Sequence, residues 1–344
     1  MNTATPATTG WVMPAEWAPH TRCWMAWPTP ERWEPLFNDV CQTHGLIAQT
    51  IAQFEDVTMV VRPDQIAEAA AQCGPNVNVL PIPVNDLWIR DTGPAFLVNQ
   101  SGQLAGTRWQ FNAWGSKHGS YADDAELSTR ILTHLCVEQF NAPLVNEGGA
   151  ISVDGNGTVL TTESVLLNTN RNPGITRAEV ERLLCAYLGA RNVIWLPGST
   201  VDKITDGHID GIAVFARVGV VIAELVADRQ DPEYDILRDN LRALQLAYDC
   251  RGCALEILTV HRPPHDATWF DDFAASYINF YIANGAIVMP KFGNRRFDTA
   301  ARDTIARAFP EREVVQISIE DVAEGGGGIH CITQQQPATG GCRE

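Results

Sequence analysis

The sequence predicts an α/β protein in which strands and helices alternate along a single domain. Runs of β-branched residues alternate with amphipathic segments, several strands end in a similar turn, and no linker-like stretch divides the 344 residues. We therefore expect residues 1–344 to fold as one domain and residues 1–10 to be flexible.

Five segments have the spacing and end signals of helices. The clearest begins after Thr176, where Glu179 completes a capping box and apolar residues recur along one face. The other helices are expected over residues 35–54, 123–137, 231–247 and 298–309.

Seven short runs rich in β-branched and aromatic residues are expected to be strands. They cover residues 57–61, 77–80, 193–196, 218–222, 278–282, 286–289 and 314–319. Similar turns at residues 25–28, 60–63, 195–198 and 287–290 indicate a faint internal repeat. This pattern fits a doubly wound sheet as well as a radial arrangement of β/α units, and it does not choose between them.

The chain is acidic, with a formal net charge of −16 and a pI near 4.9. Such a charge repels nucleic acids and anionic membranes and attracts cations, although it can serve solubility alone. The first residues do not resemble a secretion signal, and Arg217 and Glu224 interrupt the longest apolar runs. We expect a cytoplasmic protein with a small cationic partner and with no nucleic-acid or membrane partner.

Nine cysteines in a cytosolic chain are expected to be reduced thiols. Cys250 and Cys253 lack a second pair at zinc-finger spacing, so we interpret them as ordinary thiols. Cys331 differs because four glycines, residues 325–328, stand shortly before it. Glycine runs are typical of backbone that approaches another group closely, which makes Cys331 a candidate nucleophile; the alternative is an inert buried thiol.

A thiol hydrolase also needs a group that handles protons. Asp206, His208 and Asp210 alternate along what we expect to be an extended strand, which would direct all three side chains to one side. A histidine between carboxylates is favoured in its charged form and can act as an acid and later activate water. The alternative is a solvated surface turn.

Two more carboxylates stand near sharp turns. Asp91 lies in a polar segment that ends in a Gly-Pro turn, and Glu147 precedes two glycines and a strand. Their alternatives are an ion pair of Asp91 or Asp86 with Arg90 and a hairpin residue facing solvent. A planar, charged guanidinium is the ligand that best suits several carboxylates, one histidine and a thiol, because paired carboxylates can place its central carbon against sulfur.

Phrases along nearly the whole chain resemble agmatine deiminases of the bacterial-type peptidyl-arginine deiminase family, within the guanidino-group-modifying superfamily. These phrases are residues 13–17, 24–28, 88–94, 111–115, 147–149, 205–210, 276–281 and 329–335. The resemblance implies one deiminase domain with the fold of a five-bladed, pseudo-symmetric β/α propeller (a pentein), no metal and no organic cofactor, and it allows a homodimer. It also implies hydrolysis of agmatine to N-carbamoylputrescine and ammonia, a step of putrescine and polyamine biosynthesis.

The matched positions suggest individual roles. Cys331 resembles the nucleophile that forms a covalent amidino intermediate, and His208 resembles the general acid and base. The other matched positions are Asp91 and Asp210 as guanidinium-binding carboxylates, Glu147 as a carboxylate near the histidine, and Trp88 as a wall of the substrate slot.

Four positions depart from the family pattern. Gly328 and Ile204, which we count as substrate-binding positions, stand where Asn and Glu are usual, and Glu224 and Asn294 replace Trp and Asp. The alternatives are therefore a deiminase of another guanidino compound or of peptidyl-arginine, an amidinotransferase, a metal hydrolase and a non-catalytic guanidine-binding protein. His330 and His20 are expected to be structural or surface residues.

Overall fold

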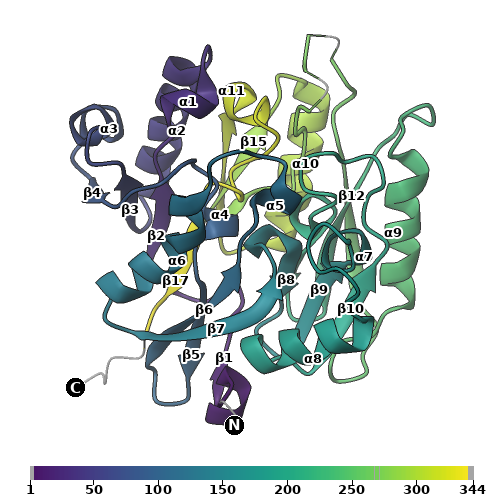
Figure 1. Cartoon of the computed structure of the whole chain (residues 1–344). Helices are drawn as coiled ribbons and strands as arrows, with labels where there is room; N and C mark the ends of the chain where they lie inside the picture. Colours follow the sequence, from purple (N-terminus) through teal and green to yellow (C-terminus); the bar gives the residue numbers. More distant parts are fainter. Residues whose placement is uncertain (1–3, 267, 271, 340–344) are drawn as a thin grey trace.

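The computed structural model describes residues 4–266, 268–270 and 272–339. Within these residues the strands form five sheets, each built from an antiparallel strand pair, a helix and a strand that runs parallel to the second strand of the pair. The sheets stand around a common centre, and the long helices lie outside them (Figure 1). The five-bladed β/α propeller is confirmed, and a doubly wound sheet is excluded.

Four blades follow one order of elements along the chain. The first joins β5 (Ala95–Asn99) and β6 (Leu104–Gln110) through α6 (Ala122–His134) to β7 (Glu138–Val145). The next three are β8 (Ile151–Val153), β9 (Thr158–Thr162), α8 (Arg177–Leu188) and β10 (Asn192–Leu196); β11 (Ala213–Arg217), β12 (Val220–Leu225), α9 (Tyr234–Leu246) and β13 (Glu256–His261); and β14 (Tyr281–Ala283), β15 (Ala286–Lys291), α10 (Arg295–Ala308) and β16 (Glu313–Ser318).

The fifth blade is made from both ends of the chain. The C-terminal β17 (Gln334–Pro337) pairs antiparallel with β2 (His20–Ala26), which closes the ring (Figure 1). This closure also fixes the segment with Cys331, which directly precedes β17. The remaining elements of the blade are α2 (Phe37–Ile51), β3 (Asp56–Val61), α3 (Ile66–Cys73) and β4 (Val77–Pro81), and the short β1 (Trp11–Val12) pairs with β5 of the neighbouring blade.

Eight short helices lie among the described residues. They are η1 (Pro6–Thr9), α1 (Pro30–Trp33), α4 (Ile89–Thr92), α5 (Ala113–Ser116), η2 (Gly148–Ala150), α7 (Glu163–Leu166), η3 (Ile209–Gly211) and α11 (Glu320–Ala323), of which η1, η2 and η3 are 3-10 helices. Four of them, α4, η2, η3 and α11, connect one blade to the next. Because η1 packs against α8 and buries Pro6, part of the segment expected to be flexible has regular structure. Residues 1–3 lie outside the described part.

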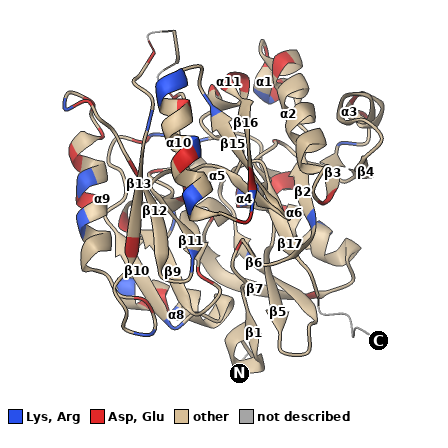
Figure 2. Ribbon diagram, turned by 180° about the vertical axis from the view of Figure 1, so that it is seen from behind, with Lys and Arg blue, Asp and Glu red and all other residues tan. Residues whose placement is uncertain are grey.

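The middle strands of two blades are buried on both faces. Every residue of β9 and of β12 is buried, which is typical of parallel strands covered by helices. Charged residues of both signs gather on outer helices such as α9 and α10, while the strands carry few (Figure 2). Among the described helices, none is both long and apolar enough to cross a bilayer.

Helix ends follow their capping residues, which corrects one prediction. At α8 the Thr176 hydroxyl accepts a hydrogen bond from the Glu179 N–H, as the capping box predicts. At α10 the Asn294 side chain is the cap, so the helix begins at Arg295 and the predicted start at Asp298 is wrong. Asp298 lies one turn inside this helix, buried, where it accepts a hydrogen bond from a tyrosine hydroxyl.

Several predicted strands and helices have different ends. α2 stops at Ile51 and α6 at His134, each three residues before its predicted end. β15 continues through Pro290 instead of turning. Its antiparallel pairing with β14 extends only to Val288, opposite Tyr281, so the nitrogen of Pro290 needs no partner on that side. β14 begins only at Tyr281, and the start of the predicted strand 218–222 forms the turn at Gly219, where φ is 76°. α9 begins at Tyr234, three residues later than predicted.

Candidate active site

The side chains expected to form the site come from different blades and meet at one place. Asp91 belongs to α4, Glu147 precedes η2, His208 and Asp210 lie at η3, and Cys331 precedes β17. The backbone at Gly149 shows how closely they meet. A side-chain carbon there would lie 2.6 Å from His208 Nδ1, 2.9 Å from Asp91 Oδ1 and 3.0 Å from Asp210 Oδ2.

His208 is buried between two carboxylates. Its Nε2 lies 3.4 Å from Glu147 Oε2, and its Nδ1 lies 3.8 Å from Asp91 Oδ1. Burial acts to lower the pKa of His208, but the Asp91 and Glu147 carboxylates outweigh it and raise this pKa to about 9. At neutral pH the ring is therefore an imidazolium that can donate a proton.

Glu147 is completely buried and has both oxygens engaged. One oxygen faces His208, and the other accepts a hydrogen bond from Arg171 Nε at 2.7 Å. Burial acts to raise the pKa of Glu147, but the hydrogen bond with His208 and the charge of Arg171 outweigh it and lower this pKa. Glu147 is therefore an ionised carboxylate that supports His208.

Cys331 lies among polar groups that control its proton. Its Sγ is 3.6 Å from Asp210 Oδ2 and 3.3 Å from Asn279 Nδ2. Burial, followed by the charges of Asp210 and Asp91, raises the pKa of the Cys331 thiol well above its ordinary value. A cation bound between these carboxylates would oppose that effect, so a cationic ligand would itself favour the thiolate.

Asp210 is supported by His330 from behind. His330 Nδ1 lies 2.8 Å from Asp210 Oδ2, and its Nε2 lies 3.0 Å from Glu16 Oε2. Burial acts to raise the pKa of Asp210, but its hydrogen bond and charge interaction with His330 outweigh it and lower this pKa. His330, expected to be a structural or surface residue, is buried and contacts a group of the site directly.

Asp91 is fixed by two donors. Its Oδ1 accepts a hydrogen bond from the Gly149 N–H, and its Oδ2 accepts one from Trp114 Nε1, both at 2.8 Å. Trp114 lies in a run of four residues with left-handed backbone, residues 113–116, with its own φ at 53°. Such backbone is costly for residues other than glycine, and here it presents the indole to Asp91.

The glycine run approaches its neighbours as closely as predicted. A side-chain carbon at Gly327 would lie 2.4 Å from the Trp88 ring, and one at Gly326 would lie 2.0 Å from the Ile204 side chain. Gly328 packs against Asn279 in the same way, at 2.6 Å from its Oδ1. The run therefore lets Trp88, Ile204 and Asn279 surround the segment that carries Cys331.

The prediction that Asp206, His208 and Asp210 share one face of a strand is wrong. The segment is a loop that leads into η3, and Asp206 has left-handed backbone at φ 65°, which ends the alternation. The Asp206 carboxylate instead pairs with Lys117 at 2.8 Å and Arg171 at 2.7 Å. Only His208 and Asp210 of the three reach the site.

Several residues of the site were not singled out from the sequence. Asn279, His330, Trp114 and Glu16 all lie inside the family-like phrases, so position in those phrases was an available signal. Arg171 lies outside them, in a run with three asparagines at residues 168–172. The Arg90 side chain donates to the His330 carbonyl and lies near Glu16, so it does not form the ion pair with Asp91 or Asp86 that was considered.

The site opens into a cavity of about 1070 Å³. His208, Asp210, Asn279 and Cys331 are among its lining residues, together with Ile204. More of its charged lining residues are acidic than basic, and one of the basic ones, Arg262, is paired with Glu224 and Glu233. In the described part of the chain, no cluster of three or more His, Cys, Asp or Glu side chains is arranged to hold a metal ion.

The comparisons with known proteins agree with this geometry. The model of the Porphyromonas-type peptidyl-arginine deiminase family matches residues 12–337. The chain is 47% identical to a putative agmatine deiminase of Legionella pneumophila (strain Paris) and 39% identical to the agmatine deiminase of Stutzerimonas stutzeri (strain A1501), each alignment covering 98% of both chains. The solved agmatine deiminase of Enterococcus faecalis has a TM-score of 0.92 and 32% identity over 98% of this chain and 99% of that one. The chain therefore belongs to the Porphyromonas-type peptidyl-arginine deiminase family.

Proposed function

We propose that this chain is a hydrolase that converts agmatine to N-carbamoylputrescine and ammonia. The observation that carries the proposal is the convergence of a thiol, an imidazolium and the carboxylates of Asp91 and Asp210, with Cys331, His208 and Asp210 lining one cavity. The names of the relatives, which are agmatine deiminases, support the choice of substrate.

Asp91 and Asp210 are the carboxylates that would hold the guanidinium. Glu147 is less suited to this, because the ion pair with Arg171 already offsets its charge, whereas the two hydrogen-bond donors to Asp91 are the neutral Gly149 N–H and Trp114 indole. A guanidinium offers donors in a fixed plane, so two carboxylates on different sides orient it as well as bind it. In this orientation its central carbon would face Cys331 Sγ, which lies 3.6 Å from Asp210.

The reaction would proceed in two displacements at this carbon. The Cys331 thiolate forms a carbon–sulfur bond, and His208 gives its proton to the departing nitrogen, so that ammonia leaves. His208 then takes a proton from water, whose oxygen attacks the same carbon. The carbon–sulfur bond breaks, the hydroxyl proton of the intermediate passes to solvent, the thiolate is restored and the neutral ureido product is released.

The charge of the cavity favours a substrate with a cationic or neutral far end. Asp202, Asp228 and Asp231 line the cavity together with Lys203, and the positive charge of Arg262 is offset by Glu224 and Glu233. This excess of negative charge attracts the ammonium of agmatine and repels the carboxylate of free arginine. Ile204 provides an apolar wall, which also favours guanidino compounds with an uncharged tail as a second candidate.

The test is turnover of a substrate panel by chelator-treated protein. The panel contains agmatine, a neutral alkylguanidine, arginine and an arginine peptide, and the assay measures ammonia and ureido product. We expect agmatine to react fastest and Cys331→Ala to keep its fold but lose turnover by about 10⁴-fold or more. Faster reaction of the alkylguanidine or peptide would change the substrate, transfer of the amidine to an amine without ureido product would indicate an amidinotransferase, and silence on all four would favour a binding protein.

A further inference from the structure

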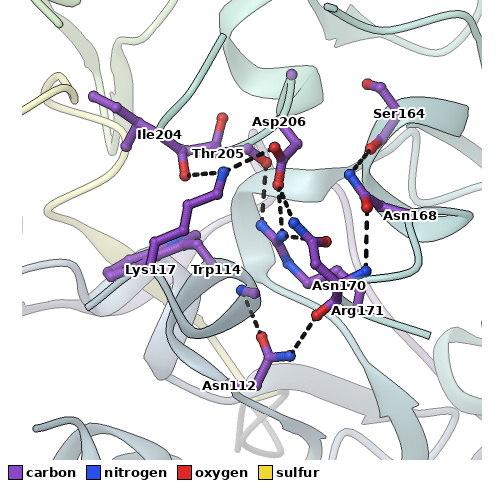
Figure 3. Close-up of polar contacts among 12 residues, drawn as sticks. Asn112, Trp114, Lys117, Ser164, Asn168, Asn170, Arg171, Ile204, Thr205 and Asp206 are labelled. Atoms are coloured by element: carbon purple, nitrogen blue, oxygen red, sulfur yellow. Dashed lines mark hydrogen bonds and ion pairs between the residues drawn. The ribbon is translucent and has the colours of Figure 1, made fainter. Parts of the chain in front are cut away.

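One arginine that contacts no reacting atom joins two parts of the site. The Arg171 side chain is completely buried, in the loop between α7 and α8. Its Nε donates to Glu147 Oε1 at 2.7 Å. Its Nη1 donates to Asp206 Oδ2 at 2.7 Å, and its Nη2 donates to the Thr205 carbonyl at 3.1 Å (Figure 3). The same guanidinium thus contacts the carboxylate behind the His208 ring and the backbone that leads to His208.

Asp206 is itself held from several sides. Lys117 Nζ lies 2.8 Å from Asp206 Oδ1 and donates to the Ile204 carbonyl at 3.0 Å (Figure 3). The Asn170 amide donates to Asp206 Oδ2 at 3.0 Å. Asp206 therefore serves as a fixed anchor for Arg171 on the side away from Glu147, and the Ile204 backbone on the cavity wall is tied to the same group.

The position of the proton between Glu147 and His208 is the property that Arg171 can control. His208 faces the carboxylates of Glu147, Asp91 and Asp210, and Cys331 lies beyond Asp210. A buried carboxylate and imidazole can exist as an ion pair or, after transfer of one proton, as a neutral pair. Burial favours the neutral pair, whereas a cation bonded to the far oxygen of Glu147 favours the ion pair.

We propose that Arg171 is a positioning residue that keeps Glu147 ionised and directed at His208, and thereby keeps the proton on the His208 ring. This rests on the proposed function, in which that proton is given to the departing ammonia. Arg171 touches neither substrate nor sulfur in this role. It acts on one side through Glu147 and on the other through the loop of residues 199–207, which carries Thr205 and Asp206.

The test compares pH profiles of kcat/KM for the wild-type enzyme and Arg171→Met with agmatine. His208 must be protonated to release ammonia, so the alkaline limb of the profile reports the loss of its proton. Without Arg171 the proton moves more readily to Glu147, and we expect the alkaline limb to shift to lower pH by about one unit or more. Glu147→Gln should shift the limb in the same direction, and adding Arg171→Met to it should produce little further shift, because Arg171 acts through Glu147.

Two variants separate this role from general support of the fold. Arg171→Lys keeps the charge, so we expect its alkaline limb to lie close to the wild-type position even where kcat is reduced. If Arg171→Met cannot be purified, the alkaline limb of Arg171→Lys is compared with that of Glu147→Gln instead. Arg177→Met is the matched control, because Arg177 is also paired with two carboxylates but is half exposed on the surface of α8. It should leave the profile unchanged.

The proposal is overturned if Arg171→Met, folded as judged by its thermal unfolding, lowers kcat at every pH without moving the alkaline limb. It is also overturned if Arg171→Lys shifts the limb as far as Arg171→Met or Glu147→Gln does. A wild-type enzyme without turnover would instead contradict the proposed function. In that case ¹⁵N NMR of the imidazole still tests the role of Arg171, since the fraction of protonated His208 at pH near 8 should fall in Arg171→Met and stay high in Arg177→Met.

Discussion

Two chains of hydrogen-bonded side chains support the two sides of the site, and the signs of their charges alternate in opposite order. In the first chain Arg171 donates a hydrogen bond to Glu147, Glu147 lies against His208, and the histidine faces the reacting space. In the second chain His330 is hydrogen-bonded to both Glu16 and Asp210, and the Asp210 carboxylate faces the reacting space. The final member of each chain determines what the site presents, which is a proton donor on one side and a fixed negative charge on the other.

His208 and Asp210 both keep their charge although both are buried. Burial acts against the charged form of both, but carboxylates raise the pKa of His208 to about 9, while His330 helps to lower the pKa of Asp210. Each of the two is charged at neutral pH because the residue behind it has the opposite charge. The comparison predicts that breaking either chain changes the pH range of activity in a different direction.

The largest effect is expected from removing the charge at the end of the second chain. Asp210→Asn leaves the shape of the side chain but deletes the charge that faces Cys331 and that, in the proposed mechanism, holds the guanidinium. We expect kcat/KM to fall by roughly 10³-fold. Steady-state kinetics measures this, with Asp239→Asn on the exposed face of α9 as a control that stays at wild-type activity. A loss of less than tenfold in Asp210→Asn would remove Asp210 from substrate binding.

A methyl group placed between the two chains should have the next largest effect. Gly149→Ala would bring a carbon within 3.0 Å of His208 Nδ1, Asp91 Oδ1 and Asp210 Oδ2. Displacement of these groups is expected to lower kcat/KM by about 10²-fold. The matched control is Gly211→Ala, one residue after Asp210, where an added carbon meets no atom within 4 Å. Equal losses in the two variants would show that the site tolerates no backbone change here, rather than that these three groups must converge.

Removal of His330 from the middle of the second chain should change the pH dependence of kcat/KM. In His330→Gln the Asp210 carboxyl loses the cation that lowers its pKa, while its burial remains. Because Asp210 must be ionised to bind the guanidinium, its function is lost as pH falls through its pKa. The acid limb of kcat/KM should therefore move to higher pH by about one unit, mainly through KM. An unchanged acid limb would separate His330 from Asp210.

In the wild-type enzyme the first chain, through His208, determines the alkaline limb of the pH profile of kcat/KM. His208 has a raised pKa and donates a proton, so its contribution is present at lower pH and is lost as pH rises through about 9. We expect kcat/KM to decline across that region, and rates measured from neutral to alkaline pH check it. Activity that continues to rise above this region would assign the proton donor to another group.

The sequence predicted the residues that face the reacting space better than the residues that stand behind them. Cys331, His208 and Asp210 carry local signals such as the glycine run and the flanking carboxylates. The bond between Glu16 and His330 joins positions 314 residues apart, and no periodicity or spacing encodes such a contact. The supporting members of both chains depend on how the blades close into a ring, which a pattern in one segment does not reveal.

The fold shows the same division. Buried strands such as β3 and β10 and the capped helix α8 were predicted because their periodicity and end residues are local. The predictions failed where the backbone leaves regular structure to form the site. Asp206 turns into the left-handed region, and residues 277–280 form a turn and irregular backbone that place Asn279 against Cys331 instead of extending β14. Irregular backbone of this kind is held by tertiary contacts rather than by propensity.

The central claim is that Cys331 bonds to the guanidinium carbon during turnover, and the most direct measurement is trapping of that bond. Wild-type enzyme is mixed with excess agmatine, quenched in acid within the first turnovers and examined by mass spectrometry of its peptides. The predicted result is an adduct with the mass of agmatine less ammonia on the peptide that contains Cys331, and none in Cys331→Ala. An adduct on another residue, or rapid ammonia release by Cys331→Ala, would contradict the claim.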